Sequence, residues 1–114
     1  METTERIIHE YVTSEGRNTF RDWLYSLKDV RAQVKVDIRI ARLRIGNFGD
    51  AKSVGKGVYE LRIPYGPGYR IYYGLEKNEL VILLCTGDKK SQKQDIKKAQ
   101  LYWLEYIGEK NGNG

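Results

Sequence analysis

Three apolar segments in the second half of the chain, joined by two very short links, constrain the fold more than any other feature. Residues 58–64, 69–75 and 80–86 are rich in β-branched, aromatic and aliphatic side chains, which is typical of β-strands. The first link, 65–68, has the sequence Tyr-Gly-Pro-Gly, which favours a tight turn because proline fixes φ and glycine permits positive φ. The second link, 76–79, is equally short. Since neither link is long enough for a crossover, the three segments are predicted to form an antiparallel meander.

The rest of the chain is predicted to supply one more strand and three helices. Residues 5–13 fit a strand, whereas 49–55 is expected to be a loop. Apolar side chains recur at helical spacing over three segments, 17–27, 30–45 and 91–107. The predicted order is β-α-α-β-β-β-α. This is an α+β fold in which a helical hairpin and a C-terminal helix pack on a four-stranded, mainly antiparallel sheet, with the first strand at an edge.

The second predicted helix is expected to bury one apolar stripe. Asp29 is the expected N-cap, and the short link before it predicts that the first two helices form an antiparallel hairpin. The apolar side chains that share the expected buried face are Val34, Ile38, Ala41 and Ile45, widened by Ile40 and Leu43. The basic side chains expected on the opposite face are Arg31, Lys35, Arg39 and Arg42.

The length of 114 residues predicts a single domain over 1–108, followed by a flexible tail over 109–114. Cys85 lies in an apolar run and is expected to be a buried thiol, and a single cysteine cannot form an internal disulfide. For His9 a surface or core position is favoured over a catalytic role. No apolar stretch reaches the roughly 20 residues that span a bilayer, and the first residues are acidic and polar. We therefore expect a cytoplasmic protein without a metal site.

The charge distribution favours a polyanionic partner. The chain has a net charge of +5, and residues 52–114 hold eleven basic and seven acidic side chains, a net of +4. A basic half of a small domain is typical of proteins that bind a phosphate backbone. Charge alone also fits many proteins that bind no nucleic acid.

Two arginines flank the predicted 65–68 turn and form the first candidate site. Arg62 and Arg70 lie on adjacent predicted strands, where side chains on one face approach within about 5–8 Å. Two guanidinium groups without acidic partners would repel each other and bind an anion between them. The alternative is that each arginine pairs with a carboxylate such as Glu60 or Glu79. The residues alone leave both interpretations open.

A lysine cluster at the start of the last helix forms the second candidate. Lys89, Lys90 and Lys93 surround Ser91, which with Gln94 matches a capping-box pattern. Helix N-termini favour anions, so a bound phosphate would relieve the conflict between these lysines and the helix dipole. The alternative is a solvated basic face.

With these motifs described, the chain resembles the RelE/ParE superfamily of toxins, and within it the HigB-like "addiction module killer" group. The segments that carry the resemblance are 45–50, 57–63, 65–73 and 83–96. The Gly-Tyr-Arg strand start at 68–70 and the Gly-Asp-Lys helix entry at 87–89 are its most specific features. The resemblance implies a toxin of a type II toxin–antitoxin module.

The resemblance also implies an activity, partners and site residues. Relatives of the RelE and HigB types enter the ribosomal A site and cleave mRNA without a cofactor, and a cognate antitoxin neutralises them in a hetero-oligomer. The expected catalytic residues are Arg62, Arg70, Lys89 and Lys90. The expected RNA-binding residues are Lys52, Lys56, Tyr65, Tyr72 and Lys93. Where the best-known RelE members carry a tyrosine for proton transfer or stacking, this chain has Ile96.

Two other functions remain compatible with the sequence. ParE-like relatives share the fold but inhibit DNA gyrase without cleaving RNA. A nontoxic module that binds RNA or a protein partner is the third alternative.

Overall fold

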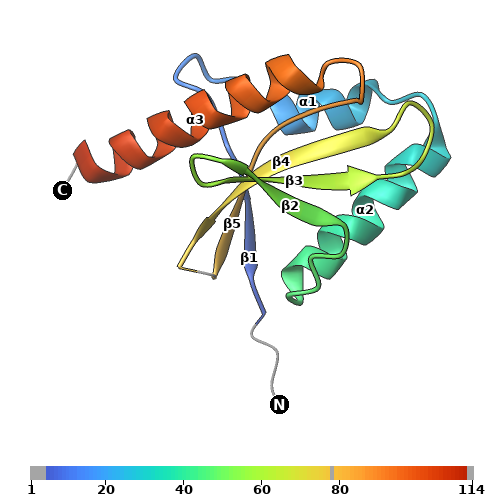
Figure 1. Cartoon of the computed structure of the whole chain (residues 1–114), viewed down its shortest axis with the longest axis horizontal. Helices are drawn as coiled ribbons and strands as arrows, with labels where there is room; N and C mark the ends of the chain where they lie inside the picture. The colour runs from blue at the N-terminus through green and yellow to red at the C-terminus, as the bar shows by residue number, and fades with distance from the viewer. Residues whose placement is uncertain (1–4, 78, 113–114) are drawn as a thin grey trace.

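The computed structural model describes residues 5–77 and 79–112 and shows a mixed sheet with three helices (Figure 1). The elements follow the chain in the order β1 (Ile7–Glu10), α1 (Thr19–Ser26), α2 (Val30–Arg44), β2 (Ala51–Gly55), β3 (Val58–Ile63), β4 (Tyr69–Glu76), β5 (Leu80–Gly87) and α3 (Gln92–Gly112). The α+β class and the meander of three strands are confirmed. No helix in the described ranges combines the length and apolar character needed to cross a membrane.

The sheet has five strands rather than the predicted four, in the order β1-β5-β4-β3-β2. β1 lies at one edge, as predicted, and pairs parallel with β5. The extra strand is β2, which pairs antiparallel with β3. The expectation of a loop over 49–55 is therefore wrong for most of that segment. Gly55, Lys56 and Gly57 all have positive φ, which allows the tight turn that joins β2 to β3.

Helices cover both faces of the sheet. Phe20 of α1 and Val36 of α2 pack with Leu61, Ile71 and Leu83 on one face. Side chains of α3 and of the opposite strand positions form a second core, which contains Ala99, Trp103, Val58, Tyr72, Ile82, Leu84 and the buried thiol of Cys85. The strands are therefore apolar on both sides, and Arg62 and Arg70, the basic residues of β3 and β4, lie at the end of these strands next to the 65–68 turn.

The main stripe expected to be the buried face of α2 is wrong, because Val34, Ile38, Ala41 and Ile45 face outward. The two residues expected to widen that stripe do face the core: Leu43 is buried with Ala32 and Val36, and the partly buried Ile40 packs against the same core. α2 is apolar on two sides, and its periodicity does not say which side meets the sheet. α1 packs mainly on β5 and α2 mainly on β3, and both helices contribute side chains to the same core.

The ends of two helices test the capping predictions. The side chain of Asp29 accepts a hydrogen bond from the backbone N–H of Arg31, so the predicted N-cap of α2 is confirmed. α3 continues to Gly112, beyond the predicted end near 107, and therefore occupies 109–112 of the predicted tail. Residues 113–114 of that tail lie outside the described residues.

Gly74→Ala is expected to destabilise the fold. A Cβ at Gly74 would overlap the Trp103 ring, which lies directly on the backbone of β4. Overpacking of this kind costs about 1–3 kcal/mol, so we expect a lower denaturation midpoint in urea. Gly108→Ala is the matched control, because a Cβ there meets nothing within 4 Å and alanine favours a helix. A midpoint that falls equally in both variants would contradict the packing argument.

Candidate functional site

Arg62 and Arg70 lie opposite each other on β3 and β4. Their Cα atoms are register partners, and directly paired residues project to the same face of a sheet. Both side chains reach Glu60 on the face that α3 covers. The structure thus brings the two predicted arginines together.

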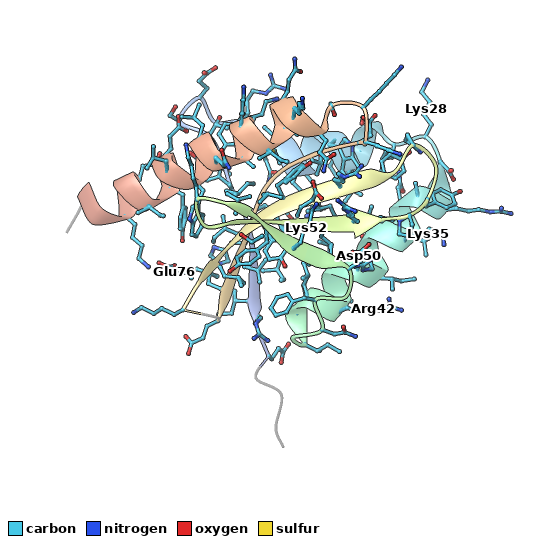
Figure 2. All side chains as sticks on the ribbon, viewed as in Figure 1. Lys28, Lys35, Arg42, Asp50, Lys52 and Glu76 are labelled. Carbon is cyan, nitrogen blue, oxygen red and sulfur yellow. The ribbon has the colours of Figure 1, made fainter. Side chains whose placement is uncertain are left out.

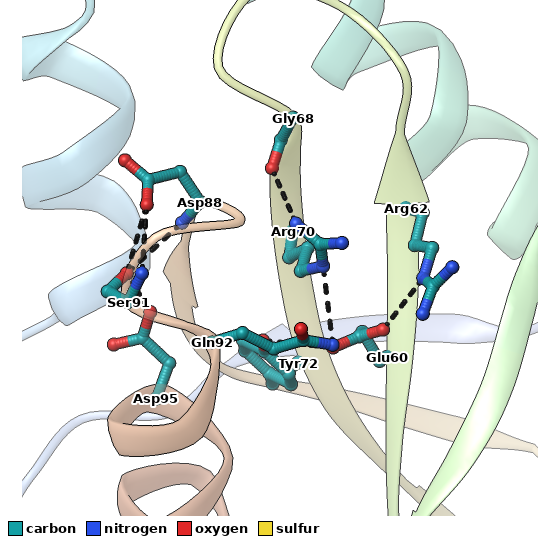
Figure 3. Close-up of polar contacts among 9 residues, drawn as sticks. All are labelled: Glu60, Arg62, Gly68, Arg70, Tyr72, Asp88, Ser91, Gln92 and Asp95. Carbon is teal, nitrogen blue, oxygen red and sulfur yellow. Dashed lines mark hydrogen bonds and ion pairs between the residues drawn. The ribbon is translucent and has the colours of Figure 1, made fainter.

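Glu60 is a buried carboxylate that holds this site together (Figure 3). Its exposed fraction is 0%. Arg62 Nε donates to Oε1 at 2.9 Å, and Arg70 Nε lies 3.6 Å from Oε2 as an ion pair. Tyr72 Oη and Gln92 Nε2 donate to Oε2 at 3.1 and 2.9 Å. One carboxylate thus joins β3, β4 and the first turn of α3.

The contacts of Glu60 determine its charge state. Burial alone would raise the pKa of Glu60, but the hydrogen bonds from Arg62, Gln92 and Tyr72, together with the charge of Arg70, outweigh it and leave the pKa lowered. The hydrogen bond to Glu60 likewise raises the pKa of Arg62. Burial, reinforced by the Glu60 charge, raises the pKa of Tyr72. Glu60 is therefore a carboxylate and Tyr72 a neutral phenol at neutral pH.

The two arginines differ in how far they are open to a ligand. The Arg62 side chain is 37% exposed, and within the described ranges its two terminal nitrogens have no hydrogen-bond partner. The Arg70 side chain is only 9% exposed, and its Nη1 donates to the carbonyl oxygen of Gly68 at 3.0 Å. Arg62 is therefore open to a ligand. Arg70 is mostly covered and serves as the second cationic partner of Glu60.

Lys89 lies beside Arg70 at the 65–68 turn. A Cβ at Gly68 would be 3.5 Å from both Arg70 Nη1 and Lys89 Cβ, so both side chains flank the turn at this residue. Lys89 N also donates to the carbonyl oxygen of Pro67 at 3.4 Å. Lys90 lines a hollow of about 450 Å³ with Pro67, Asp88 and Lys89, and the structure thus extends the basic edge from Arg70 to Lys90.

The start of α3 is organised by Asp88 and Asp95 rather than by the predicted capping box. Ser91 N donates a hydrogen bond to Asp88 Oδ1 at 3.1 Å, and the Ser91 hydroxyl donates a hydrogen bond to Asp95 Oδ2. Gly87 is required here, because a Cβ would overlap the Asp95 carboxylate. Lys93 lies on this first turn and shares a second hollow with Lys90 and Asp88.

The remaining predicted RNA-binding residues lie in different places. Lys52 is exposed and is the cross-strand partner of Glu60, so it lies on the same face as the arginines. Lys56 lines a groove along α3 with Lys97 and Leu101. The Tyr65 hydroxyl donates a hydrogen bond to Asp29 Oδ2 at 2.8 Å, and its ring packs against the core that α2 covers. Tyr72 is fully buried behind the site.

Sequence reasoning named Glu60 only as an alternative partner of the arginines and missed Gln92. Glu60 and Arg62 are two apart on one strand and must share a face, which was a usable signal. No signal indicated Gln92, because its contact spans 32 positions. Among the described residues, no group of three or more His, Cys, Asp or Glu side chains could hold a metal ion.

Comparisons with known proteins place the chain among phage-derived sequences. A family model described as "Phage derived protein Gp49-like (DUF891)" matches residues 22–101, a segment that contains every predicted site residue. A protein of Haemophilus influenzae (strain ATCC 51907 / DSM 11121 / KW20 / Rd), named only as an uncharacterized protein, is 55% identical over 83 residues. That alignment covers 73% of this chain and 84% of the relative.

Proposed function

The chain belongs to the Gp49-like family of phage-derived proteins, a toxin–antitoxin-associated family of RelE/HigB type, and on that premise we propose that it is a toxin that cleaves mRNA on the ribosome. A cognate antitoxin would hold it inactive. The observation that supports this proposal is the pair of arginines oriented by one buried carboxylate, with the side chain of Arg62 37% exposed and its terminal nitrogens without a hydrogen-bond partner among the described residues. Lys89 extends this basic edge beside Arg70.

In the proposed reaction the ribose 2′-oxygen attacks the adjacent phosphorus and the bond to the 5′-oxygen breaks. The products are a 2′,3′-cyclic phosphate and a free 5′-hydroxyl. Water takes up the proton of the 2′-hydroxyl, and the leaving 5′-oxygen gains a proton from a cationic donor. The additional negative charge on the pentacoordinate phosphate is the feature that fixed cations stabilise best.

Arg62 is proposed to donate its terminal nitrogens to that phosphate, with Lys89 close to the RNA backbone. Lys90, an ammonium at the exposed edge, is proposed to serve the leaving oxygen as a charged donor. Glu60 is a poor candidate for the base, because hydrogen bonds from Arg62, Tyr72 and Gln92 already occupy its oxygens. Its proposed role is to hold the guanidinium of Arg62 in place. The ribosome is proposed to supply the remaining geometry of the reaction.

Two assays with the purified chain test this proposal. In a reconstituted translation reaction, we expect primer extension to show new mRNA ends inside the reading frame, and these ends to disappear when ribosomes are omitted. In parallel, DNA gyrase incubated with the chain and supercoiled plasmid should remain active. Intact mRNA together with broken plasmid DNA would instead indicate a gyrase inhibitor of the ParE type. Intact mRNA and intact DNA would point to a nontoxic binding module.

A further inference from the structure

The outer face of α2 carries a stripe of apolar side chains that the fold leaves uncovered. Val30 is 68% exposed, Val34 50%, Ile38 45% and Ile45 55%, and the small side chain of Ala41 is exposed between them. Single exposed apolar residues are ordinary, but a contiguous exposed patch marks an interaction site.

This stripe is continuous and lies opposite the face that α2 buries. Successive residues of a helix are rotated by about 100°, which places the five side chains within one narrow sector. Ala32, Val36 and Leu43, which pack on the sheet, fall in the opposite sector. The stripe covers sixteen residues from Val30 to Ile45, about 22 Å at the helical rise. A helix of four turns in a partner would match that length.

One border of the stripe is basic. Arg31, Lys35 and Arg42 follow it at helical spacing and are exposed, and Figure 2 shows Lys35 and Arg42 on the outer side of the molecule. The other border carries Asp37 and Arg44.

A groove lies beside the basic border. It has a volume of about 280 Å³ and passes between α2 and the end of β3. Lys35, Ile38 and Arg42 line its helical side, and Ile63 and Tyr65 line the other. The groove therefore joins apolar walls to a basic rim.

We infer that the outer face of α2 is a docking surface for an amphipathic helix of an acidic partner protein. Apolar side chains of that helix would cover Val34 and Ile38, and its carboxylates would face Arg31 and Arg42. A second copy of this chain fits less well, because pairing two such faces would bring basic borders into the same interface.

α3 offers a shorter alternative surface. Leu101, Leu104 and Ile107 are exposed beside the α3 groove, but this stripe covers seven residues against sixteen on α2. The longer stripe with a basic border along its length is therefore the better match for a partner helix.

This docking surface is separate from the proposed RNA site. Ile63 packs under α2, whereas its neighbour Arg62 projects to the opposite face of the sheet and binds Glu60. A helix seated on α2 therefore leaves Arg62 open to solvent. The inference stands whether or not the chain cleaves RNA.

The test uses fluorescence anisotropy with the full chain and a fluorescein-labelled synthetic peptide of 18 residues, which has leucines at helical spacing and glutamates between them. We expect saturable binding to the wild-type chain. The double variant Val34→Asp, Ile38→Asp should weaken binding by about tenfold or more, since each aspartate would be buried in the interface. Both positions are half exposed, so the variant is expected to keep the circular dichroism and melting profile of the wild type.

Matched controls separate this surface from the alternatives. Leu104→Asp places one aspartate on the exposed apolar stripe of α3 and should alter the affinity by less than about twofold. A peptide with lysines in place of the glutamates should not bind. Sedimentation should show a monomer, and an RNA oligonucleotide should bind equally well with and without the acidic peptide.

The inference is wrong if the acidic peptide does not bind or if Leu104→Asp abolishes binding. Three other results would also overturn the inference. The lysine peptide could bind as well as the acidic one, or the peptide could compete with RNA for binding. The third is a dimer of this chain that the double variant Val34→Asp, Ile38→Asp dissociates.

Discussion

Arg62→Ala is expected to lower the rate of mRNA cleavage by about a hundredfold or more while the chain remains folded. Removal of one donor aimed at developing negative charge typically costs this much in enzymes that stabilise an anionic transition state. The Arg62 side chain is 37% exposed, and Glu60 would keep Arg70, Tyr72 and Gln92 as partners. The measurement is the rate of appearance of cleaved mRNA in a reconstituted translation reaction, at a matched concentration of folded protein.

Two further variants show whether the loss of cleavage rate is specific to Arg62 and to its guanidinium group. Arg44→Ala also removes one exposed arginine, but from the end of α2, and should cleave as the wild type does. Arg62→Lys keeps the charge without the planar donor pair and should recover only part of the rate. Undiminished cleavage by Arg62→Ala would remove this residue from the mechanism. Growth arrest that persists in the Arg62→Ala, Arg70→Ala double variant would indicate a different activity.

Glu60→Ala is expected to destabilise the chain by about 3 kcal/mol or more, because removal of one member of a buried ion pair leaves the other uncompensated. Arg70 would lose its only carboxylate within the described ranges, and the Tyr72 hydroxyl and the Gln92 amide would lose their acceptor. The measurement is the free energy of unfolding from urea denaturation. A loss below about 1 kcal/mol would show that water replaces the carboxylate and would contradict its role as the hub of the site.

Glu60→Gln keeps the size of the side chain and separates its charge from its shape. Because the folded state lowers the pKa of Glu60, the carboxylate stabilises the fold above its unfolded pKa of about 4.3, and this contribution is lost as the pH falls through the folded pKa. The wild-type chain should therefore lose stability more steeply than Glu60→Gln as the pH falls below about 4.3. Parallel stability curves would mean that Glu60 carries no charge-dependent stabilisation.

The parts of the fold that the sequence predicted are those governed by local chemistry. The short links at 65–68 and 76–79 leave adjacent strands little choice but antiparallel pairing, and the same links bring Arg62 and Arg70 into register. Asp29 caps α2 because its side chain needs only the next turn of the chain. Each of these features is decided within a few residues.

The parts that the sequence did not predict depend on distant partners. α2 has apolar side chains on two sides, and only the position of the sheet selects Val36 over Ile38 for burial. β2 becomes a strand because β3 offers it an edge. At the site, the contact between Glu60 and Gln92 requires α3 to lie on that face of the sheet, which no local pattern encodes.

The parallel pairing of β1 with β5 affects how the chain is completed during its synthesis. Ile7 pairs with Leu80, so a strand made among the first residues stays without its neighbour for the next 73 residues of translation. Contacts of such high sequence separation form late, because the entropy of closing the intervening loop must be overcome first. The sheet and the contact between Glu60 and Gln92 can therefore be completed only after residues 80–92 have left the ribosome that makes the chain. Until then the nascent polypeptide lacks the completed arginine site.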